Sequence, residues 1–177
     1  MAKCRLCGKK GLFLKLDKNG FCASCAEDQA KRRAAAARRK TERMKVHGTS
    51  YQQKEIEELG EHNDDYDLSV KELREDFEGE RVFELYFDCK AALIPEPENE
   101  FDKNAIRVEA DGVKIGYVPK SKTKRARALL KSPGFKAVFV DIEGGRYKIA
   151  REGEPLDKGE LAYQAYIRII YEEEPGT

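Results

Sequence analysis

Stretches in which apolar and polar residues alternate dominate the chain from Val46 onward. Residues 106–109 read Ile-Arg-Val-Glu, and residues 138–142 read Val-Phe-Val-Asp-Ile. A period of two places successive side chains on opposite faces of a strand, so these patterns predict strands. The predicted strands cover residues 45–51, 82–94, 105–110, 113–118, 135–142, 146–150 and 162–171. Strands at this spacing predict a mainly β fold with small helices, organised as a small barrel or sandwich.

The apolar positions of these strands supply the predicted core. Its members are Leu85, Phe87, Leu93, Ile106, Val108, Ile115, Val138, Val140, Ile142, Ile167 and Ile169.

Two predicted helical segments interrupt the strands, at residues 53–77 and 121–131. Between residues 55 and 80 there are 12 Asp/Glu and 2 Lys/Arg, and residues 62–65 break this acidic segment into two pieces. Such a cluster could hold a divalent cation, but the segment has no strand ends that would bring its carboxylates together. A solvated helix-loop-helix insertion at about residues 53–80 is therefore favoured.

Composition limits what the chain can be. It has 177 residues, of which 38% are charged and 40% hydrophobic, which suits one ordinary domain with an appendage and argues against a large enzyme. The sequence has no run of roughly 18 apolar residues that could span a membrane. The first residues, Met-Ala-Lys-Cys, lack the apolar region of a signal peptide. We expect a cytoplasmic protein without a membrane partner.

Charge divides the chain into two parts. Residues 1–47 contain 14 Lys/Arg and 4 Asp/Glu, whereas residues 48–177 contain 20 and 29, so a net charge of +1 conceals a basic arm. Such asymmetry is typical of a segment that binds nucleic acid or another polyanion, and a solvated basic face gives the same count.

Four of the five cysteines form two C-x2-C pairs near the start of the chain. Cys4 and Cys7 make the first pair, and Cys22 and Cys25 the second. This spacing predicts a four-thiolate site for one structural Zn2+, because each pair can occupy a tight knuckle that points two sulfurs inward. Two disulfides or a redox pair are the alternatives. The first fits poorly without a secretion signal, and the second needs a thioredoxin-like βαβ context.

The segment after the finger is rich in Ala, Arg and Lys and has almost no large apolar side chain. Its helix propensity is high, but it offers no face to bury. The basic triplets at residues 31–33 and 38–40 are seven residues apart, which on a helix places them on nearly the same stripe, about 10 Å apart. The stripe could follow a phosphate backbone, through Arg32, Arg33, Arg38, Arg39 and Lys40. A solvated spacer helix is the alternative.

A specific motif lies between Leu93 and Pro119. Its positions are Glu96, Pro97, Asn99, Phe101, Asp102, Asn104, Ala105 and Ile106, followed by Gly116, Tyr117, Val118 and Pro119. The motif resembles the hallmark of the HIRAN domain family, and residues 45–51 look like the opening strand of that family. The resemblance spans about residues 45–150. It implies an OB-like β-barrel that binds DNA and captures the free 3′ end of a single strand.

The resemblance also implies site residues. Asp102 is the candidate for the 3′-hydroxyl contact, and Phe101 and Tyr51 are the candidate stacking platforms, since aromatic faces stack bases without reading their identity. Asn99 and Asn104 are expected to tie the loop together, because Asn side chains satisfy nearby backbone groups. Apart from the resemblance, the stretch from Val113 to Lys136 contains eight Lys/Arg and no acid, which offers phosphate contacts, and a solvated helix face is the alternative. The candidate nucleic-acid-binding residues of this domain are Tyr51, Phe101, Asp102, Asn104, Tyr117, Lys120, Lys122, Lys124, Arg125 and Arg127.

Catalysis is not expected. The sequence has no G-x-x-x-x-G-K-S/T motif for an ATPase, and neither His47 nor His62 has a recognisable nucleophile partner. Two alternatives remain. One is a metal-dependent nuclease built on Glu96, Glu98 and Asp102, and the other is an adaptor that docks a protein through the finger or the acidic segment.

The predicted organisation has four parts. A zinc finger at residues 1–25 is followed by a basic helix at 26–44, a HIRAN-like barrel domain at 45–172 and a tail at 173–177. The predicted function is nucleic-acid binding, with DNA 3′ ends in repair or replication-fork processing as the specific form.

Overall fold

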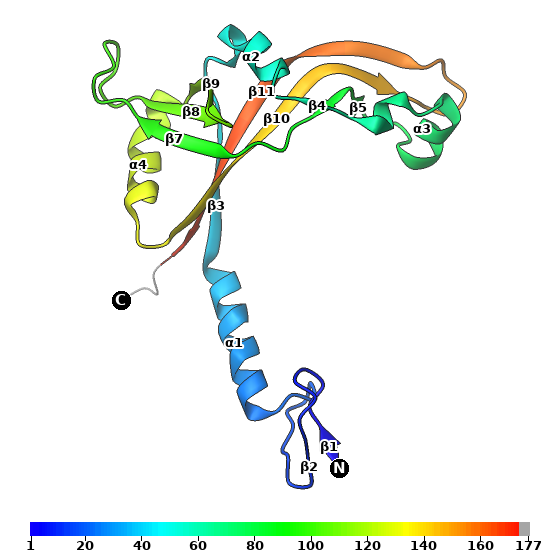
Figure 1. Cartoon of the computed structure of the whole chain (residues 1–177), viewed down its shortest axis with the longest axis vertical. Helices are drawn as coiled ribbons and strands as arrows, with labels where there is room; N and C mark the ends of the chain where they lie inside the picture. The colour runs from blue at the N-terminus through cyan, green and yellow to red at the C-terminus, as the bar shows by residue number, and fades with distance from the viewer. Residues whose placement is uncertain (174–177) are drawn as a thin grey trace. The chain divides into compact units, whose positions relative to one another are not determined.

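The computed structural model describes residues 1–173, with the backbone alone at residues 34 and 35 (Figure 1). The chain forms two compact units. One contains residues 1–40 and the described end of the chain from Glu172, and the other contains Thr41–Tyr171. Most of the predicted tail, residues 174–177, lies outside the described residues. No helix among the described residues has the length and apolar character needed to cross a membrane.

The first unit consists of a small finger and one helix. β1 (Ala2–Lys3) and β2 (Lys10–Gly11) pair antiparallel, and α1 (Ala23–Arg38) follows. The helix was predicted to reach residue 44, but residues 39–45 form a strand, β3 (Arg39–Lys45). The reason is that α1 has no apolar face to bury, whereas Met44 and Val46, two positions apart, are both buried in the core of the second unit.

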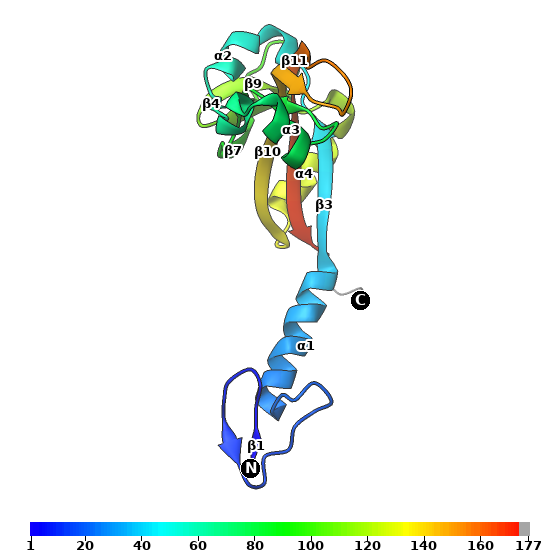
Figure 2. The ribbon, with the colours of Figure 1, turned by 90° about the vertical axis from the view of Figure 1, so that its right-hand side faces the viewer.

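The larger sheet of the second unit contains β3, β5 (Val82–Phe83), β10 (Phe135–Ile149) and β11 (Asp157–Glu172) in the order β3-β11-β10-β5. The long antiparallel pair β10 and β11 is visible in Figures 1 and 2. Two separate strands were predicted for β10. One continuous strand forms instead, with a register shift after Glu143. Glycine is required at this shift, because a Cβ at Gly144 would lie 2.6 Å from the Tyr163 Cα.

The smaller sheet is an antiparallel meander of β7 (Ala91–Pro95), β8 (Ile106–Ala110) and β9 (Val113–Tyr117). A single strand was predicted at residues 82–94, but three short strands form instead. β5 pairs in the larger sheet, β6 (Leu85–Tyr86) pairs with β4 (Glu61–His62), and β7 belongs to the smaller sheet. The mainly β prediction is confirmed. The described strands do not close into a barrel, since they form four separate sheets.

The core of the second unit lies between these sheets and α4 (Thr123–Lys131), which contacts β10. All eleven predicted core residues are either buried in this cluster or packed against it. The prediction succeeds because the alternating pattern of each strand identifies its inward face.

The acidic insertion folds into short elements. These are α2 (Gln53–Glu57), β4, the 3₁₀ helix η2 (Asp64–Asp67) and α3 (Val70–Asp76). A capping box begins α3, since Ser69 and Glu72 satisfy each other's backbone N–H groups. Leu73 and Val82 pack into a second, smaller core with Ala150. Residues 49–51, predicted as the end of a strand, form the 3₁₀ helix η1 (Thr49–Tyr51) instead.

Candidate nucleic-acid interface and metal centre

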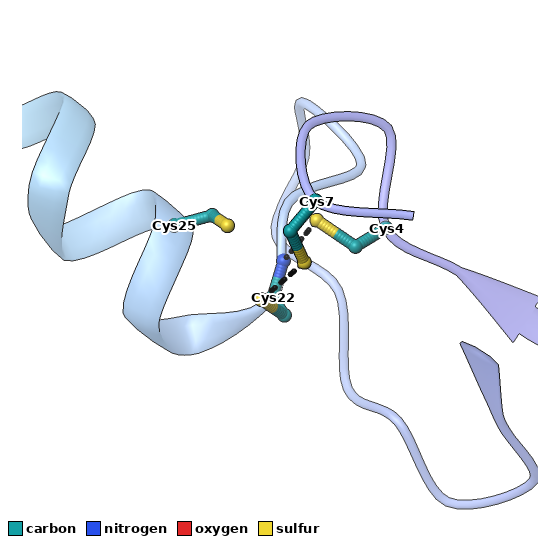
Figure 3. A group of neighbouring side chains, drawn as sticks. All are labelled: Cys4, Cys7, Cys22 and Cys25. Atoms are coloured by element: carbon teal, nitrogen blue, oxygen red, sulfur yellow. Dashed lines mark hydrogen bonds between the residues drawn. The ribbon is translucent and has the colours of Figure 1, made fainter. Parts of the chain in front are cut away.

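The four cysteines of the two C-x2-C motifs come together in the finger. Their sulfur atoms all lie within 4.8 Å of one another, and Cys4, Cys22 and Cys25 are buried while Cys7 is exposed. Figure 3 shows Cys4 and Cys7 on one loop, with Cys22 at the start of α1 and Cys25 in its first turn. None of the cysteines is in a disulfide. The cluster could therefore bind a metal ion, as the spacing predicted.

Hydrogen bonds within the finger stabilise thiolates unequally. Backbone N–H groups of Cys7 and Cys22 lower the pKa of the Cys4 thiol to about 6, and the Cys22 N–H donates to the Cys4 Sγ over 3.3 Å. Hydrogen bonds to the neighbouring sulfurs of Cys22 and Cys7 hold the proton on the Cys25 thiol and raise its pKa to about 12. A bound cation favours the thiolate form of all four groups.

The loop between β7 and β8 carries the sequence motif, and its own side chains fix its shape. The Asn99 Oδ1 accepts the backbone N–H groups of Phe101 and Asp102, each over 3.0 Å. The Asn99 amide donates to Glu96 over 2.9 Å, and Arg107 donates to the other oxygen of Glu96 over 2.8 Å. Asn99, Tyr117 and Arg107 together hold the pKa of Glu96 below its usual range. Asn99 thus ties the loop together as expected.

Asp102 and Asn104 have other environments in the same loop. The Asp102 carboxylate is partly buried and accepts the Asn104 backbone N–H over 2.8 Å. The Asn104 side chain is exposed, so Asn104 helps to hold the loop through its backbone N–H, which donates to Asp102. Phe101 is 94% exposed. An ordered loop that leaves a phenyl ring in solvent is a suitable platform for stacking.

A backbone bridge brings the loop surface next to the start of the domain. The His47 N–H donates to the Tyr117 carbonyl over 2.9 Å, and the Tyr117 N–H donates to the His47 carbonyl over 2.8 Å. This approach requires glycine at position 116, where φ is +151° and a Cβ would lie 2.4 Å from the His47 oxygen. The motif glycine therefore places His47 and Tyr117 side by side.

Three adjoining hollows surround Tyr117. The first, which we call the end pocket, has a volume of about 270 Å³ and is lined by Phe101, Asp102 and Lys120 among others. The second, the acidic hollow, has a volume of about 470 Å³ and is lined by Glu96, Glu98 and Glu100 among others. The third, the basic hollow, has a volume of about 400 Å³ and is lined by Lys114 and Tyr51 among others. The structure thus brings together five predicted site residues, namely Tyr51, Phe101, Asp102, Tyr117 and Lys120.

The other predicted cations of this domain do not line these hollows. Lys122 and Arg125 pair with Glu42 of β3 at 3.7 and 3.4 Å, and Arg125 also donates to the Tyr171 hydroxyl over 2.9 Å. Arg127 donates to the Lys103 carbonyl over 3.4 Å, which links α4 to the motif loop. Lys124 is exposed on α4.

The cations of the basic arm are exposed, but they do not share one helical stripe. Arg32 and Arg33 lie in α1, and Arg38 is its last residue. Arg39 and Lys40 belong to β3, where successive side chains point to opposite faces, and Lys40 lies 3.9 Å from Glu173. The expected helical stripe ends where the strand begins.

Two polar residues that contact or adjoin Tyr117, His47 and Lys114, were not among the predicted site residues. His47 lines both the end pocket and the basic hollow, and Lys114 lines the basic hollow with its Nζ 4.7 Å from the centre of the Tyr117 ring. The signal for Lys114 was its place in the basic stretch from Val113 to Lys136. A spacing of three in a regular strand would put Lys114 on the face opposite Tyr117, and a register shift in the β8–β9 pairing brings the two side chains together. Nothing in the sequence identified His47, because its position depends on the bridge to Tyr117.

The geometry defines a mainly β domain with an exposed aromatic and basic surface. The family model described as HIRAN domain matches residues 42–152. The chain therefore belongs to the HIRAN domain family, whose OB-like fold agrees with the predicted fold class. Membership indicates nucleic-acid binding. No curated protein and no solved structure matches the chain.

Proposed function

We propose that the chain is a non-enzymatic protein that binds single-stranded DNA at a free 3′ end, in DNA repair or replication-fork processing. The observation that carries the proposal is the end pocket, where a carboxylate, a cation, the exposed ring of Phe101 and the half-buried ring of Tyr117 converge. It combines an acceptor for a terminal hydroxyl with surfaces for a base and a phosphate.

Asp102 supplies discrimination between an end and the interior of a strand. Its carboxylate accepts a hydrogen bond from a free 3′-hydroxyl, and a bond to a charged group contributes about 1.5–3 kcal/mol. A phosphate at the same place is repelled by that carboxylate. Lys120, which lines the same pocket, attracts the phosphate on the 5′ side of the terminal nucleotide.

Aromatic rings supply affinity without sequence preference. Phe101 and Tyr51 are 94% and 84% exposed, so neither ring is needed to fill the core. Stacking of a base on such a ring contributes about 1–3 kcal/mol.

The finger and the arm have separate roles in this proposal. The finger binds one structural Zn2+, since four cysteine sulfurs complete a tetrahedral shell and leave no open position for a substrate. The exposed cations of α1 and the start of β3 contact phosphates of the DNA that flanks the end. Their contribution falls steeply with salt, because it arises from counterion release.

Fluorescence anisotropy of the full chain tests the proposal with three labelled DNAs. These are a single strand with a 3′-hydroxyl, the same strand with a 3′-phosphate, and a blunt duplex, each with and without magnesium. We expect the free 3′-hydroxyl strand to bind at least about tenfold tighter than the phosphorylated strand, without cleavage.

Asp102→Asn is the informative variant, because the amide oxygen can still accept the Asn104 N–H. It should reduce the preference for the 3′-hydroxyl, chiefly by tolerating the phosphate. Asp111→Asn is the matched control, since Asp111 lies in the turn between β8 and β9 and its carboxylate accepts the Lys90 N–H. Equal binding of all three DNAs would contradict end recognition. Absence of binding would favour the protein adaptor, and magnesium-dependent cleavage the nuclease.

A further inference from the structure

The finger leaves in solvent two of the apolar side chains that its small core could use. Leu12 and Phe13 form a turn directly after β2 and are exposed, Phe13 to 92%. The next two leucines, Leu14 and Leu16, pack against the buried cysteines instead. A unit this small gains stability from each apolar group that it buries. An adjoining pair of large apolar side chains in solvent therefore indicates a binding surface.

The charge of the finger is almost entirely positive. Residues 1–25 contain six exposed Lys/Arg, at positions 3, 5, 9, 10, 15 and 18, and a single acid, Asp17. The Asp17 carboxylate accepts the backbone N–H groups of Asn19 and Phe21 over 2.9 and 2.8 Å, so it is occupied within its own turn. The ion pairs described for this unit involve arm residues, and none of them involves a finger cation. A Zn2+ ion with four thiolates adds about −2, which leaves the finger positive.

Two of these cations face each other across the small ladder of β1 and β2 (Figure 1). Lys3 of β1 is paired directly with Lys10 of β2 in the antiparallel register. Opposed residues project from the same face of a ladder with Cβ atoms about 4.5–5.5 Å apart, and like charges at this place are destabilising. Lys3 also lines, with Arg5, a hollow of about 480 Å³ at the first cysteine pair. An anion between the two ammonium groups removes their repulsion, so the ladder favours a polyanionic partner.

Nucleic acid fits this surface better than an acidic protein does. The positive charge continues from the finger into α1, which begins at Ala23 inside the second C-x2-C pair. Membership of the HIRAN domain family indicates nucleic-acid binding for the same chain. An exposed ring beside cations suits unpaired bases of any sequence, whereas a duplex keeps its base faces inside the stack.

We infer that the finger is a second nucleic-acid surface, which binds unpaired nucleotides within a strand and needs no free end. Lys3 and Lys10 contact phosphates, and Phe13 stacks a base. This role goes beyond the proposed function, because the finger shares no residue with the end pocket. A short strand with a free 3′ end is held by the end pocket alone.

A circular single strand separates the two surfaces, because it has no 3′ end for the pocket. The labelled circle is titrated with the full, metal-loaded chain and binding is followed by fluorescence anisotropy. We expect Phe13→Ala to weaken binding at least about fivefold. Lys10→Gln should weaken it about three- to tenfold and lower the salt slope by about one.

Lys10→Gln also has a signature that a purely structural role would not give. The substitution removes the repulsion between positions 3 and 10, so the finger should resist a chelator better than the wild type while it binds DNA less well. Hydrogen exchange of residues 1–25 at increasing chelator concentration measures this resistance. Weaker binding together with a less resistant finger would show that Lys10 acts through the fold, and would overturn its place at the surface.

Matched variants test the chemistry of each contact. Phe13→Tyr keeps an aromatic face and should bind the circle as the wild type does, whereas Phe13→Leu keeps an apolar side chain without that face and should resemble Phe13→Ala. Lys71→Gln is the charge control, since Lys71 is an exposed cation of α3 in the other unit. It should leave the affinity and the salt slope unchanged.

The outcomes separate this inference from the proposed function. If Phe13→Ala and Lys10→Gln bind the circle as tightly as the wild type, or if the wild type does not bind it, the finger surface is wrong, and an apolar protein partner would be favoured. Wild-type affinity in Phe13→Leu would overturn base stacking. None of these results changes the preference of a linear strand for a free 3′-hydroxyl, which tests the end pocket.

Discussion

The finger and the HIRAN domain are held together in different ways. In the finger, the buried cluster consists of Cys4, Cys22 and Cys25, with only Leu14, Leu16 and Phe21 packed against it. In the HIRAN domain, fifteen buried residues form one core and the strands supply most of them. A unit as small as the finger cannot bury enough apolar surface to offset its conformational entropy. The difference leads us to expect that a bound metal ion stabilises the finger, whereas hydrophobic burial stabilises the HIRAN domain.

Removal of metal should have the largest effect, and only in the finger. A strong chelator is expected to unfold residues 1–25, since structural zinc contributes about 10–16 kcal/mol in small zinc-binding peptides. Hydrogen exchange of the full chain should show fast exchange there and unchanged protection in residues 106–117. Cys89→Ser is the control, because Cys89 lies in the HIRAN domain, and it should keep one metal ion per chain. Unfolding of both regions by the chelator would contradict the comparison.

Removing a core side chain should affect only the HIRAN domain. Ile167 is fully buried, so Ile167→Ala is expected to lower the free energy of unfolding by about 2–5 kcal/mol, through lost burial and the cavity it leaves. Guanidinium titration would measure this. Leu161 in the same strand is 40% exposed, and Leu161→Ala should cost roughly 1 kcal/mol or less. Similar losses for the two variants would show that this core is not what stabilises the domain.

Two equally exposed phenylalanines, one in each region, test whether the HIRAN domain or the finger binds single-stranded DNA. Phe101 of the HIRAN domain and Phe13 of the finger are 94% and 92% exposed. Phe101→Ala should weaken single-stranded DNA binding by about 1–3 kcal/mol, because it removes a stacking surface. Phe13→Ala should leave the affinity for a short 3′-hydroxyl strand unchanged. Anisotropy titrations of both variants provide the measurement, and the reverse order would move the binding site to the finger.

Acid should lower the stability of the motif loop, by less than the preceding changes. The folded-state pKa of Glu96 is depressed, with its Asn99 hydrogen bond as the first cause. Its stabilising contribution is therefore fully present above the ordinary value of 4.5 and is lost as pH falls through the depressed pKa. Glu96→Gln should be roughly 1 kcal/mol less stable than wild type at neutral pH, and the difference should vanish in acid. A difference that grows as pH falls would contradict this assignment.

The sequence predicted the features that depend on local spacing. The two C-x2-C pairs predicted the four-sulfur cluster, the alternation at residues 106–109 predicted β8 and its buried face, and the motif predicted a loop tied by Asn99. Each of these depends on residues that are close along the chain or on a fixed periodicity.

Features that depend on distant partners were not predicted. The basic helix ends at Arg38 because the following residues join β11, more than a hundred residues away. Lys122 and Arg125 were expected at the nucleic-acid surface, but Glu42 pairs with both across about 80 positions of sequence. Lys114 and His47 belong to the surface because of a close backbone approach that Gly116 permits. No local pattern encodes such contacts.

The most direct test of the proposed binding surface is hydrogen exchange of the full, metal-loaded chain with and without a saturating single strand that has a free 3′-hydroxyl. The account predicts slower exchange at residues 46–52, 96–106 and 113–120, which surround the three hollows, and little change at residues 53–80. Slower exchange confined to residues 26–40 would contradict it, because the strand would then be bound by the basic arm alone.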